Sequence, residues 1–263
     1  MVLYWVILPI AWLLWHLVWR IEVTGREYLI GDEAGRGYVV ASNHISDIDP
    51  VFICISIFSW KRVCIIAKEE LFKNPVIGWF LGILGAVPIA RGKADTKALE
   101  KVTAQVEKGH GMLIFAEGTR TKNGRTGKIK SGAFVVASAA GADMIPCRII
   151  YHTKSGRMRP FCRVRVCFGP HIPAEDLHIE DPRRSIAQIR VLKKRLSDSW
   201  DALYTEHRFP DSPTLEELNA RGTEKPAGQT VQPAEPARAA VELPKMELPK
   251  VDVSGGADPE GGA

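Results

Sequence analysis

The chain has 263 residues, enough for one sizeable domain with a buried core and additional segments. Basic residues exceed acidic ones unevenly: residues 1–208 hold 30 Lys and Arg against 20 Asp and Glu, whereas residues 209–263 hold 5 against 10. A basic body suits anionic partners such as phosphates, acidic lipids or acidic carrier proteins. The basic residues are scattered, without interleaved aromatic residues or zinc-finger spacing, so the sequence argues against a nucleic-acid partner.

The N-terminal segment is strongly apolar. Residues 2–19, VLYWVILPIAWLLWHLVW, carry no charge and precede Arg20. As a helix they would measure about 27 Å, slightly less than a hydrocarbon core of about 30 Å. Their four tryptophans suit a membrane interface. We predict a membrane anchor, either a short span or a helix lying in one leaflet, with a buried core helix as the alternative.

The orientation and the thiol chemistry agree with a domain that faces the cytoplasm. Arg20 and the basic body behind it favour the cytoplasmic side of the cell inner membrane. The cysteines are odd in number and contain no C-x-x-C pair, so we expect buried, reduced thiols at Cys54, Cys64, Cys147, Cys162 and Cys167.

The C-terminal segment is the opposite case. Residues 209–263 are rich in Pro, Ala, Glu and Gly and have no aromatic residue after Phe209. Such a composition buries too little apolar surface to offset chain entropy, which predicts a disordered tail. The chain is therefore divided into an anchor helix at 1–20, a folded domain at 21–208 and a tail at 209–263.

Between these ends, apolar strand-like runs alternate with helical patterns. Strands are predicted at 37–42, 62–68, 86–91, 111–118, 143–151 and 161–169, and helices at 95–109, 131–141 and 182–206. Residues 50–58 are interpreted as a helix or a buried apolar segment, and residues 74–85 as an apolar helix or a hairpin. This alternation predicts an α/β fold, and the two closing strands favour a mixed, mostly parallel sheet flanked by helices. No G-x-G-x-x-G follows the first strand and no P-loop pattern occurs.

Three of the predicted strands end in polar clusters. Because ligands bind outside the carboxyl ends of strands in open α/β sheets, we expect these clusters to converge on one pocket. The clusters are Asn43, His44 and Asp49 after the first strand, Arg91 at the end of the third, and Glu117, Gly118, Thr119 and Arg120 at the end of the fourth.

His44 is a candidate general base, because a neutral imidazole accepts a proton near physiological pH. It needs a carboxylate on its other ring nitrogen, and Asp47 and Asp49 are the candidates. A straight helix would place Asp49 about 140° around from His44. Pro50 disfavours helix at the preceding residue, so a turn could instead fold Asp49 back towards His44. The alternative roles are capping of the next helix for Asp49 and a solvated or local turn position for Asp47.

The segment FAEGTRT, residues 115–121, suits an anionic ligand. Gly118 allows a tight turn close to a ligand, and the planar guanidinium of Arg120 matches phosphate oxygens. Glu117 suits either a substrate hydroxyl or a structural arginine as donor. A basic loop follows, which is interpreted as solvated, with guidance of an anion as the alternative; it carries Lys122, Arg125, Lys128 and Lys130.

Together these segments resemble the 1-acylglycerol-3-phosphate acyltransferases of the His-x4-Asp glycerolipid acyltransferase superfamily. The likeness extends over residues 35–170, and Thr121 replaces the commoner serine of the third block. A further segment, AKEELFKNPVIGW, is similar to the family's K-x-E-L-x-x-x-P-x-x-G. Four blocks occur in the family's order: NHISDIDP, GAVPIAR, FAEGTRT and IPCRI.

The resemblance implies transfer of an acyl chain from acyl-CoA or acyl carrier protein to the sn-2 hydroxyl of lysophosphatidate, giving phosphatidate in phospholipid biosynthesis. It implies that His44 is the base and that Asp49 orients it. The acyl donor is a substrate, and no cofactor or metal is implied. The acceptor's glycerol phosphate would be bound by Arg91, Glu117, Gly118, Thr119 and Arg120. An anchor fits this role, because acceptor and product reside in the membrane.

Three other functions stay open at this point. An acyltransferase with another acceptor, such as glycerol 3-phosphate or another lysolipid, would use the same base. A metal-dependent phosphoester hydrolase would use His44, Asp47 and Asp49 as ligands, although no second His/Asp cluster completes a coordination sphere. A membrane-anchored module that binds phospholipid without catalysis would not depend on His44 for turnover.

Overall fold

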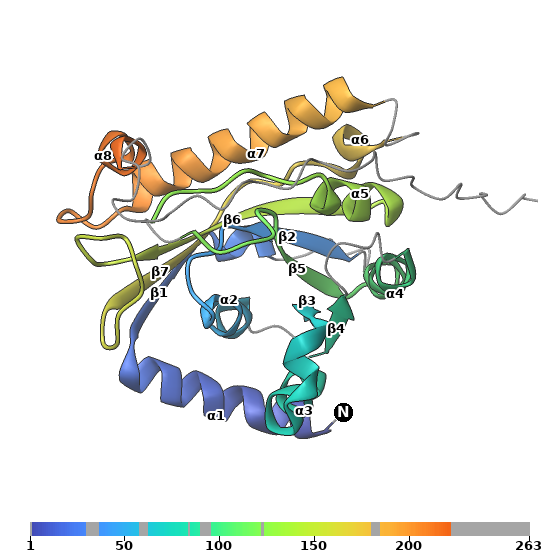
Figure 1. Cartoon of the computed structure of the whole chain (residues 1–263), viewed down its shortest axis with the longest axis horizontal. Helices are drawn as coiled ribbons and strands as arrows, with labels where there is room; N and C mark the ends of the chain where they lie inside the picture. The colour runs from blue at the N-terminus through green and yellow to red at the C-terminus, as the bar shows by residue number, and fades with distance from the viewer. Residues whose placement is uncertain are drawn as a thin grey trace, which may run out of the picture. The chain divides into compact units, whose positions relative to one another are not determined.

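A seven-stranded sheet with helices on both faces forms the centre of the computed structural model (Figure 1). The structure describes residues 2–29, 37–57, 63–83, 85–89, 96–121, 124–179 and 185–221. The strands are β1 (Arg20–Thr24), β2 (Tyr38–Ser42), β3 (Val63–Lys68), β4 (Ala86–Ile89), β5 (Gly111–Phe115), β6 (Asp143–Tyr151) and β7 (Arg163–Phe168).

The strand order is β1-β7-β6-β2-β5-β3-β4. Neighbouring strands run parallel throughout, except that β6 and β7 are antiparallel. The predicted mixed, mostly parallel sheet is therefore confirmed. The sequence did not predict β1, which begins directly after the N-terminal helix and pairs with β7.

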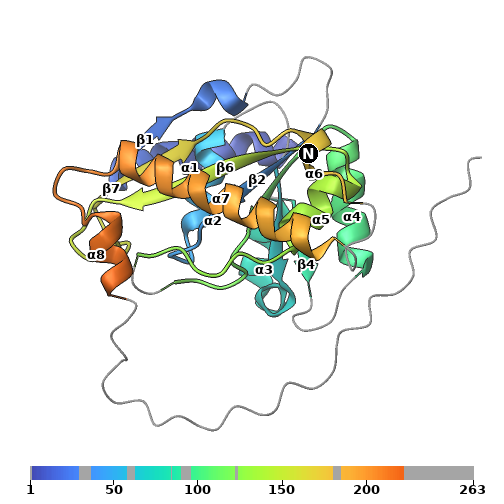
Figure 2. The same cartoon turned by 90° about the horizontal axis from the view of Figure 1, so that it is seen from above.

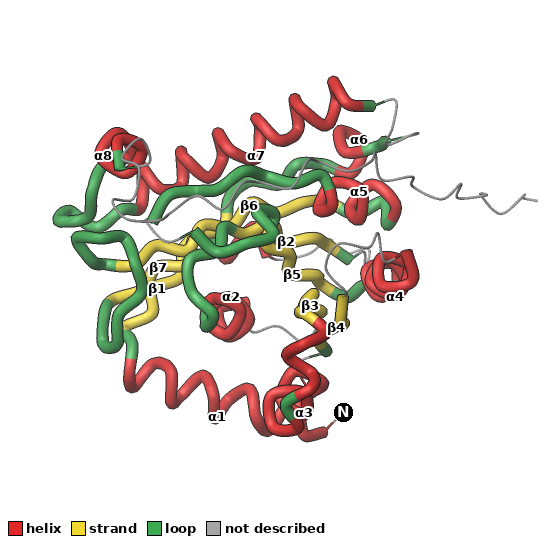
Figure 3. Tube along the Cα trace, in the orientation of Figure 1, coloured by secondary structure: helices red, strands yellow, loops and turns green. Residues whose placement is uncertain are grey.

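The helices are α1 (Val2–Val18), α2 (Asp49–Ile57), α3 (Pro75–Ile83), α4 (Thr96–Glu107), α5 (Gly132–Ala139), α6 (Ala174–Leu177), α7 (Ile186–His207) and α8 (Leu215–Ala220). Two short 3-10 helices, η1 (Arg26–Leu29) and η2 (Glu69–Lys73), precede the first gap and α3. Figure 3 shows how loops join these elements at the edges of the sheet.

The two faces of the sheet carry separate apolar cores, because successive strand residues point to opposite faces. Tyr38 and Val40 of β2 belong to the core that contains α2, whereas Val39 and Ala41 belong to the core formed with α4, α5, α6 and α7. Helix α2 lies below the sheet in Figure 1, and α5, α6 and α7 lie above it. Seen from above in Figure 2, α7 crosses the strands. The buried Trp200 of α7 donates its Nε1–H to the Ala41 carbonyl at 3.1 Å.

The register of β2 positions the functional loops. Ser42 pairs with Phe115 of β5 and with Cys147 of β6. The chains that leave Ser42 and Phe115 therefore start at the same edge of the sheet. His44 and Glu117 each lie two residues beyond this pair, while β6 continues four residues further, to Tyr151.

Helix α1 packs with only part of its surface against the rest of the described chain. Trp15 and the adjoining Trp19 contact the core on the α2 face. Large apolar side chains on α1 remain exposed: Ile10 at 53%, Trp12 at 39%, Leu13 at 62%, Leu14 at 50% and Leu17 at 81%. Within the described ranges, no helix has both the length and the apolar character needed to cross a bilayer.

The predicted disorder from Phe209 onward is wrong for residues 209–221. Phe209 is 1% exposed and lies under the guanidinium of Arg165, whose carbon is 4.3 Å from the ring centroid. Thr214 and Glu217 form a reciprocal capping box that starts α8, and Leu218 is buried. The sequence signal was the T-x-x-E pattern, which specifies a helix start in spite of the polar composition around it. Residues 222–263 lie outside the described part of the chain.

Candidate active site

The loop between β2 and α2 folds back on itself around Asp49. One carboxylate oxygen, Oδ2, accepts three hydrogen bonds: from His44 Nδ1 at 3.0 Å, from the Ile45 backbone N–H at 2.6 Å and from the Ser46 backbone N–H at 2.8 Å. The other oxygen, Oδ1, accepts a hydrogen bond from the Tyr151 hydroxyl. Asp49 is fully buried, so these donors replace its solvent.

The turn predicted over residues 44–49 is therefore present, and it brings Asp49 to His44. Asp49 is the first residue of α2, but its backbone donors precede it in the chain. The carboxylate thus closes the loop instead of capping the first turn of α2.

The geometry gives the His44 imidazole one defined orientation. Its Nδ1 points at a carboxylate that can only accept, so in the neutral ring Nδ1 carries the proton and Nε2 presents a lone pair. Within the described residues, Nε2 has no hydrogen-bond partner. The ring stacks on Phe115 with centroids 4.0 Å apart, and 17% of the side chain is exposed. An oriented, neutral imidazole with an accessible nitrogen can act as a general base.

Tyr151 is a site residue that the sequence did not reveal, because it ends an apolar strand and resembles core. Burial and the neighbouring Asp49 raise the pKa of its phenol well above the ordinary value. The hydroxyl therefore stays protonated and donates to Asp49. It links the carboxyl end of β6 to the base.

Asn43 fixes the start of the same loop. Its side-chain oxygen accepts from the Ile149 backbone N–H at 2.8 Å, and its side-chain nitrogen donates to the Ile149 carbonyl at 3.3 Å. This buried pair of bonds extends the β2–β6 pairing by one side chain. The sequence placed Asn43 in the cluster with His44, and the structure shows that it anchors the loop.

Glu117 lies in the loop that follows β5, residues 116–121, which is the second loop of the site, and it is 2% exposed. Burial raises the pKa of its carboxyl to about 7, against the opposing effects of the Gly127 and His44 backbone N–H groups and of Arg148. Its Oε1 accepts from the His44 N–H at 3.3 Å, so Glu117 supports the backbone of the base. This position favours the structural role that the sequence left open over direct contact with a substrate hydroxyl.

Arg148 is a buried cation whose positive charge lowers the pKa of the Glu117 carboxyl. It is 1% exposed, its guanidinium carbon lies 5.1 Å from the Tyr204 ring centroid, and burial lowers its pKa. Asp201 and Glu117 oppose that shift. The sequence missed Arg148 because it occupies one position of a strand that otherwise reads as apolar core.

The pKa of Glu117 predicts a dependence of stability on pH. An unfolded glutamate ionises near its ordinary pKa of 4.5, whereas the folded one keeps its proton until about 7. The raised pKa of Glu117 therefore adds on the order of 3 kcal/mol to the free energy of unfolding, measured relative to high pH. This stabilisation is fully present below pH 4.5 and should be lost as the pH rises to about 7. Urea unfolding at a series of pH values measures it.

The matched variants for this prediction are Glu117→Gln and Glu100→Gln. Gln cannot titrate, so the first variant should lack the pH-dependent component. Glu100 is exposed on α4, and its replacement should keep the component. Equal pH profiles for the parent and Glu117→Gln would contradict the prediction.

The remaining residues of the second loop face solvent. Gly118, with φ +68°, makes the turn that a side chain would strain. Thr119 and Arg120 are exposed, and Arg120 forms an ion pair with Asp47 of the first loop. Both partners of this pair are largely exposed, so it is weak and can exchange for another anion.

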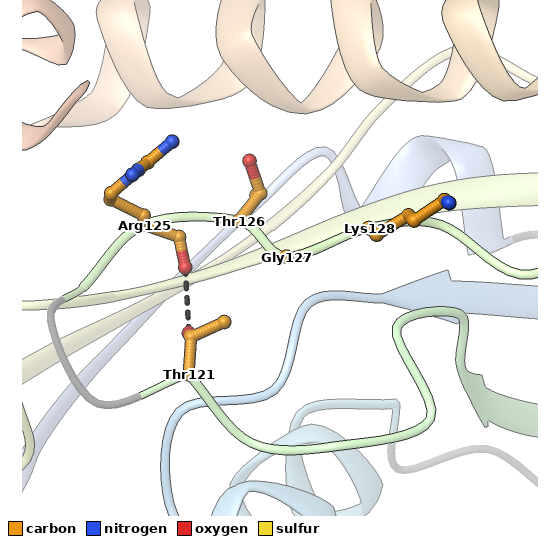
Figure 4. Close-up of a pocket in the computed structure, with 5 residues that line it drawn as sticks. All are labelled: Thr121, Arg125, Thr126, Gly127 and Lys128. Atoms are coloured by element: carbon orange, nitrogen blue, oxygen red, sulfur yellow. Dashed lines mark hydrogen bonds between the residues drawn. The ribbon is translucent and has the colours of Figure 1, made fainter. Parts of the chain in front are cut away.

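The second loop and the basic segment after it border an open hollow of about 440 Å³, whose lining residues are drawn in Figure 4. Thr121 joins its parts: its backbone N–H donates to the His44 carbonyl at 2.9 Å, and its hydroxyl donates to the Arg125 carbonyl at 2.6 Å. The hollow is lined by Thr121, Arg125, Thr126, Gly127 and Lys128.

The structure thus brings together two of the three predicted clusters. Arg91, the third, lies outside the described residues. A grouping of three or more His, Cys, Asp or Glu side chains fit to hold a metal ion is not found among the described residues. The carboxylates of the proposed hydrolase site are engaged by N–H and O–H donors, Asp49 as above and Asp47 by Arg120.

Comparison with known proteins agrees with this arrangement. A family model described as Acyltransferase matches residues 20–150. A chloroplastic 1-acyl-sn-glycerol-3-phosphate acyltransferase of Arabidopsis thaliana is 33% identical over 134 residues, covering 50% of this chain and 36% of that protein. A 1-acyl-sn-glycerol-3-phosphate acyltransferase of Bacillus subtilis is 25% identical over 179 residues, covering 68% of this chain and 87% of that protein.

The fold also has a solved counterpart. The crystal structure of the 1-acyl-sn-glycerophosphate acyltransferase PlsC from Thermotoga maritima matches with a TM-score of 0.52 at 22% identity, over 72% of this chain and 73% of that one. The match to the plant protein spans little more than a third of that protein's length. The family model covers both loops of the site, the one at His44 and the one at Glu117. The chain therefore belongs to the acyltransferase family.

Proposed function

We propose that this chain is a 1-acyl-sn-glycerol-3-phosphate O-acyltransferase that converts lysophosphatidate to phosphatidate. The observation that carries the proposal is the partly exposed His44, which is hydrogen-bonded through Nδ1 to the buried Asp49. Relatives in plants and bacteria bear this activity in their names, which supports the choice of acceptor.

The chemistry follows from the orientation of the imidazole. His44 Nε2 removes the proton from the sn-2 hydroxyl as its oxygen attacks the thioester carbonyl carbon. The tetrahedral intermediate expels the thiolate by breaking the carbon–sulfur bond, and the imidazolium gives its proton to this thiolate, which leaves as the thiol. Asp49 stabilises the imidazolium while it exists, and a base placed in this way contributes about 10²–10⁴-fold in rate.

The acceptor's phosphate is proposed to bind at the exposed part of the second loop. Arg120 offers a planar set of donors, and its partner Asp47 is exposed and exchangeable. Thr119 and the turn at Gly118 adjoin it, and Arg91 is proposed to complete the site. Glu117 contributes indirectly, by accepting a hydrogen bond from the backbone N–H of His44. Positioning the hydroxyl in this way adds to the effect of the base.

The donor is proposed to be acyl-CoA or acyl carrier protein, and the site is proposed to work at the cytoplasmic surface of the cell inner membrane. Support comes from α1, where exposed Ile10, Leu13, Leu14 and Leu17 recur at helical spacing and form one apolar stripe. A helix of this kind lies in the membrane interface with its stripe buried in lipid. Both acceptor and product would then reach the site from the bilayer.

Replacing Leu13 and Leu17 by glutamate should release the chain from vesicles. Each leucine contributes about 1.5–3 kcal/mol when buried, so loss of the pair should weaken partitioning by at least about a hundredfold. Flotation with vesicles measures the bound fraction. The matched control is glutamate at Ile186 and Val191, which are 64% and 67% exposed on α7. Equal losses for the two pairs, or none for the first, would contradict the role of α1.

An acceptor panel tests the proposed function. Membranes that contain the chain are given labelled acyl-CoA or acyl carrier protein with lysophosphatidate, glycerol 3-phosphate or another lysolipid. We expect labelled phosphatidate to form, and lysophosphatidate to have the highest kcat/KM of the acceptors in the panel. Preference for another member of the panel would assign a different acceptor, and transfer to none would favour a lipid-binding module.

A further inference from the structure

A second hollow, of about 740 Å³, lies at the loop that joins β6 to β7. It is bounded by residues 152–155, by residues 159–162 and by Arg221 after α8. Its volume falls within the range of sites for small molecules, about 300–1,000 Å³. It does not share a lining residue with the hollow beside the second loop of the active site.

The charge of this hollow is positive. Lys154, Arg159 and Arg221 line it and are exposed. In the part of the chain that the structure describes, the side chains of Lys154 and Arg159 form no ion pair, and Arg221 donates only to the Lys154 carbonyl. His152, one of the lining residues, has an acidic partner: its Nε2 lies 3.7 Å from the Asp211 carboxylate. Several unpaired cations around a hollow favour a phosphate-bearing anion.

Phe161 gives the hollow an aromatic wall at a conformational cost. Residues 159–162 form a turn closed by the Cys162 N–H and the Arg159 carbonyl, with Pro160 at its second position. Phe161 takes the third position with φ +60°, where glycine or asparagine is usual. Its side chain is 78% exposed, so burial in this chain does not offset the strain. An unfavourable backbone held for an exposed aromatic ring indicates a ligand for that ring.

The hollow lies at the same edge of the sheet as the base. It begins at His152, directly after Tyr151, whose hydroxyl contacts Asp49. The 152–157 segment also lies against the basic segment that follows the second loop: a Cβ atom added at Gly124 would lie 3.0 Å from the Gly156 Cα. A ligand with one end in the hollow and a long arm could therefore reach His44 across these loops.

We propose that this hollow binds the nucleotide end of coenzyme A, with its phosphates on Lys154, Arg159 and Arg221 and its adenine on Phe161. The inference rests on the proposed function, because it names the part of the donor that the chain holds. The pantetheine arm then extends from the hollow across these loops and brings the thioester to His44. An aromatic face beside clustered cations around a hollow fits a nucleotide, since a base stacks while phosphates pair with the cations.

The variants are Lys154→Ala with Arg159→Ala, and Phe161→Gly, in the full chain. The matched control is Lys101→Ala with Arg190→Ala, which removes the same charge from exposed positions on α4 and α7. KM is measured for acyl-CoA and for lysophosphatidate. Calorimetry measures binding of adenosine 3',5'-bisphosphate, and flotation measures binding to vesicles of equal parts phosphatidylcholine and phosphatidylglycerol.

The double variant should raise KM for acyl-CoA about tenfold and weaken bisphosphate binding equally, because charge-assisted hydrogen bonds are lost. KM for lysophosphatidate, vesicle binding and the control should not change. Phe161→Gly should raise KM for acyl-CoA severalfold while keeping or raising Tm, since glycine relieves the strain.

Two results would overturn the proposal. One is bisphosphate binding that the variants leave unchanged or that the parent lacks. The other is a loss of vesicle binding with unchanged bisphosphate binding, which would assign the hollow to lipid head groups. Calorimetry does not need turnover, so a parent that binds the bisphosphate but acylates none of the acceptors would disprove the proposed function and retain the nucleotide site.

Discussion

Replacing His44 by alanine should lower kcat for acyl transfer by about 10²–10⁴-fold, because the reaction loses its base. The ring is partly exposed and stacks on one face of Phe115, so its removal leaves the two cores of the sheet in place. Tm should therefore change little. The measurement is the steady-state rate at saturating acyl-CoA and lysophosphatidate, with thermal unfolding followed on the same preparation.

The chain offers a matched control at the other end of β6. His171 Nδ1 lies 3.3 Å from the carboxylate of Asp143, the first residue of β6, so it forms a second His–Asp pair away from the proposed site. His171→Ala should keep kcat within a few-fold of the parent. Full activity in His44→Ala would remove the proposed mechanism. Loss of the parent's activity on addition of a chelator would instead favour the metal-dependent hydrolase.

Replacing Asp49 by asparagine should lower kcat by up to about 10⁴-fold, although the side chain keeps its size. Oδ2 faces His44 Nδ1 and the Ile45 and Ser46 N–H groups, whereas Oδ1 faces the Tyr151 hydroxyl. An asparagine with its NH₂ group at the Oδ2 position opposes both N–H groups with a donor and moves the ring proton to Nε2, which leaves no lone pair for the acceptor hydroxyl. With the NH₂ group at the Oδ1 position, the three bonds are kept and the Tyr151 hydroxyl has to accept, but a neutral amide does not stabilise the imidazolium that forms during transfer.

Stability should fall in the same variant. Depending on the rotamer, either buried N–H groups lose their acceptor or their charge-assisted hydrogen bonds become neutral ones. The free energy of unfolding should therefore decrease by about 1–3 kcal/mol. Asp143→Asn, at the second His–Asp pair, should lower stability without the loss of kcat. A pH–rate profile separates the two effects, because only the change of tautomer removes the base at every pH. An Asp49→Asn enzyme with the parent's profile and rate would show that Asp49 only closes the loop.

The sequence predicted the strands and the type of sheet because their signals are local. Apolar runs such as those in β2 and β6 are long and bounded by polar residues, and the two closing strands without a helix between them indicate an antiparallel pair. The strand order is different in kind. It depends on which strands lie side by side in the sheet, and no local pattern in a single sequence specifies that.

The site divides in the same way. The turn from His44 to Asp49 could be predicted because Pro50 and a five-residue spacing constrain it. Tyr151 and Arg148 could not, since both occupy strand positions whose patterns read as core. Their roles arise only when β6 is placed beside β2. The burial of Glu117 likewise depends on the loop at Gly127, which no local pattern places over it.

The position of β2 between β5 and β6 has a consequence for how the site comes into existence during synthesis. The turn that joins His44 to Asp49 spans five residues and can form as soon as it leaves the ribosome. Glu117 follows His44 by 73 residues, and Tyr151 follows Asp49 by 102. Contacts between residues so far apart in the sequence require closure of a long loop, which costs entropy, so they form later than the local turn. In a nascent chain, α1 and the histidine–aspartate turn are therefore synthesised before the residues that contact this turn, Glu117 and Tyr151. The complete site forms only after β6 has been made and has paired with β2.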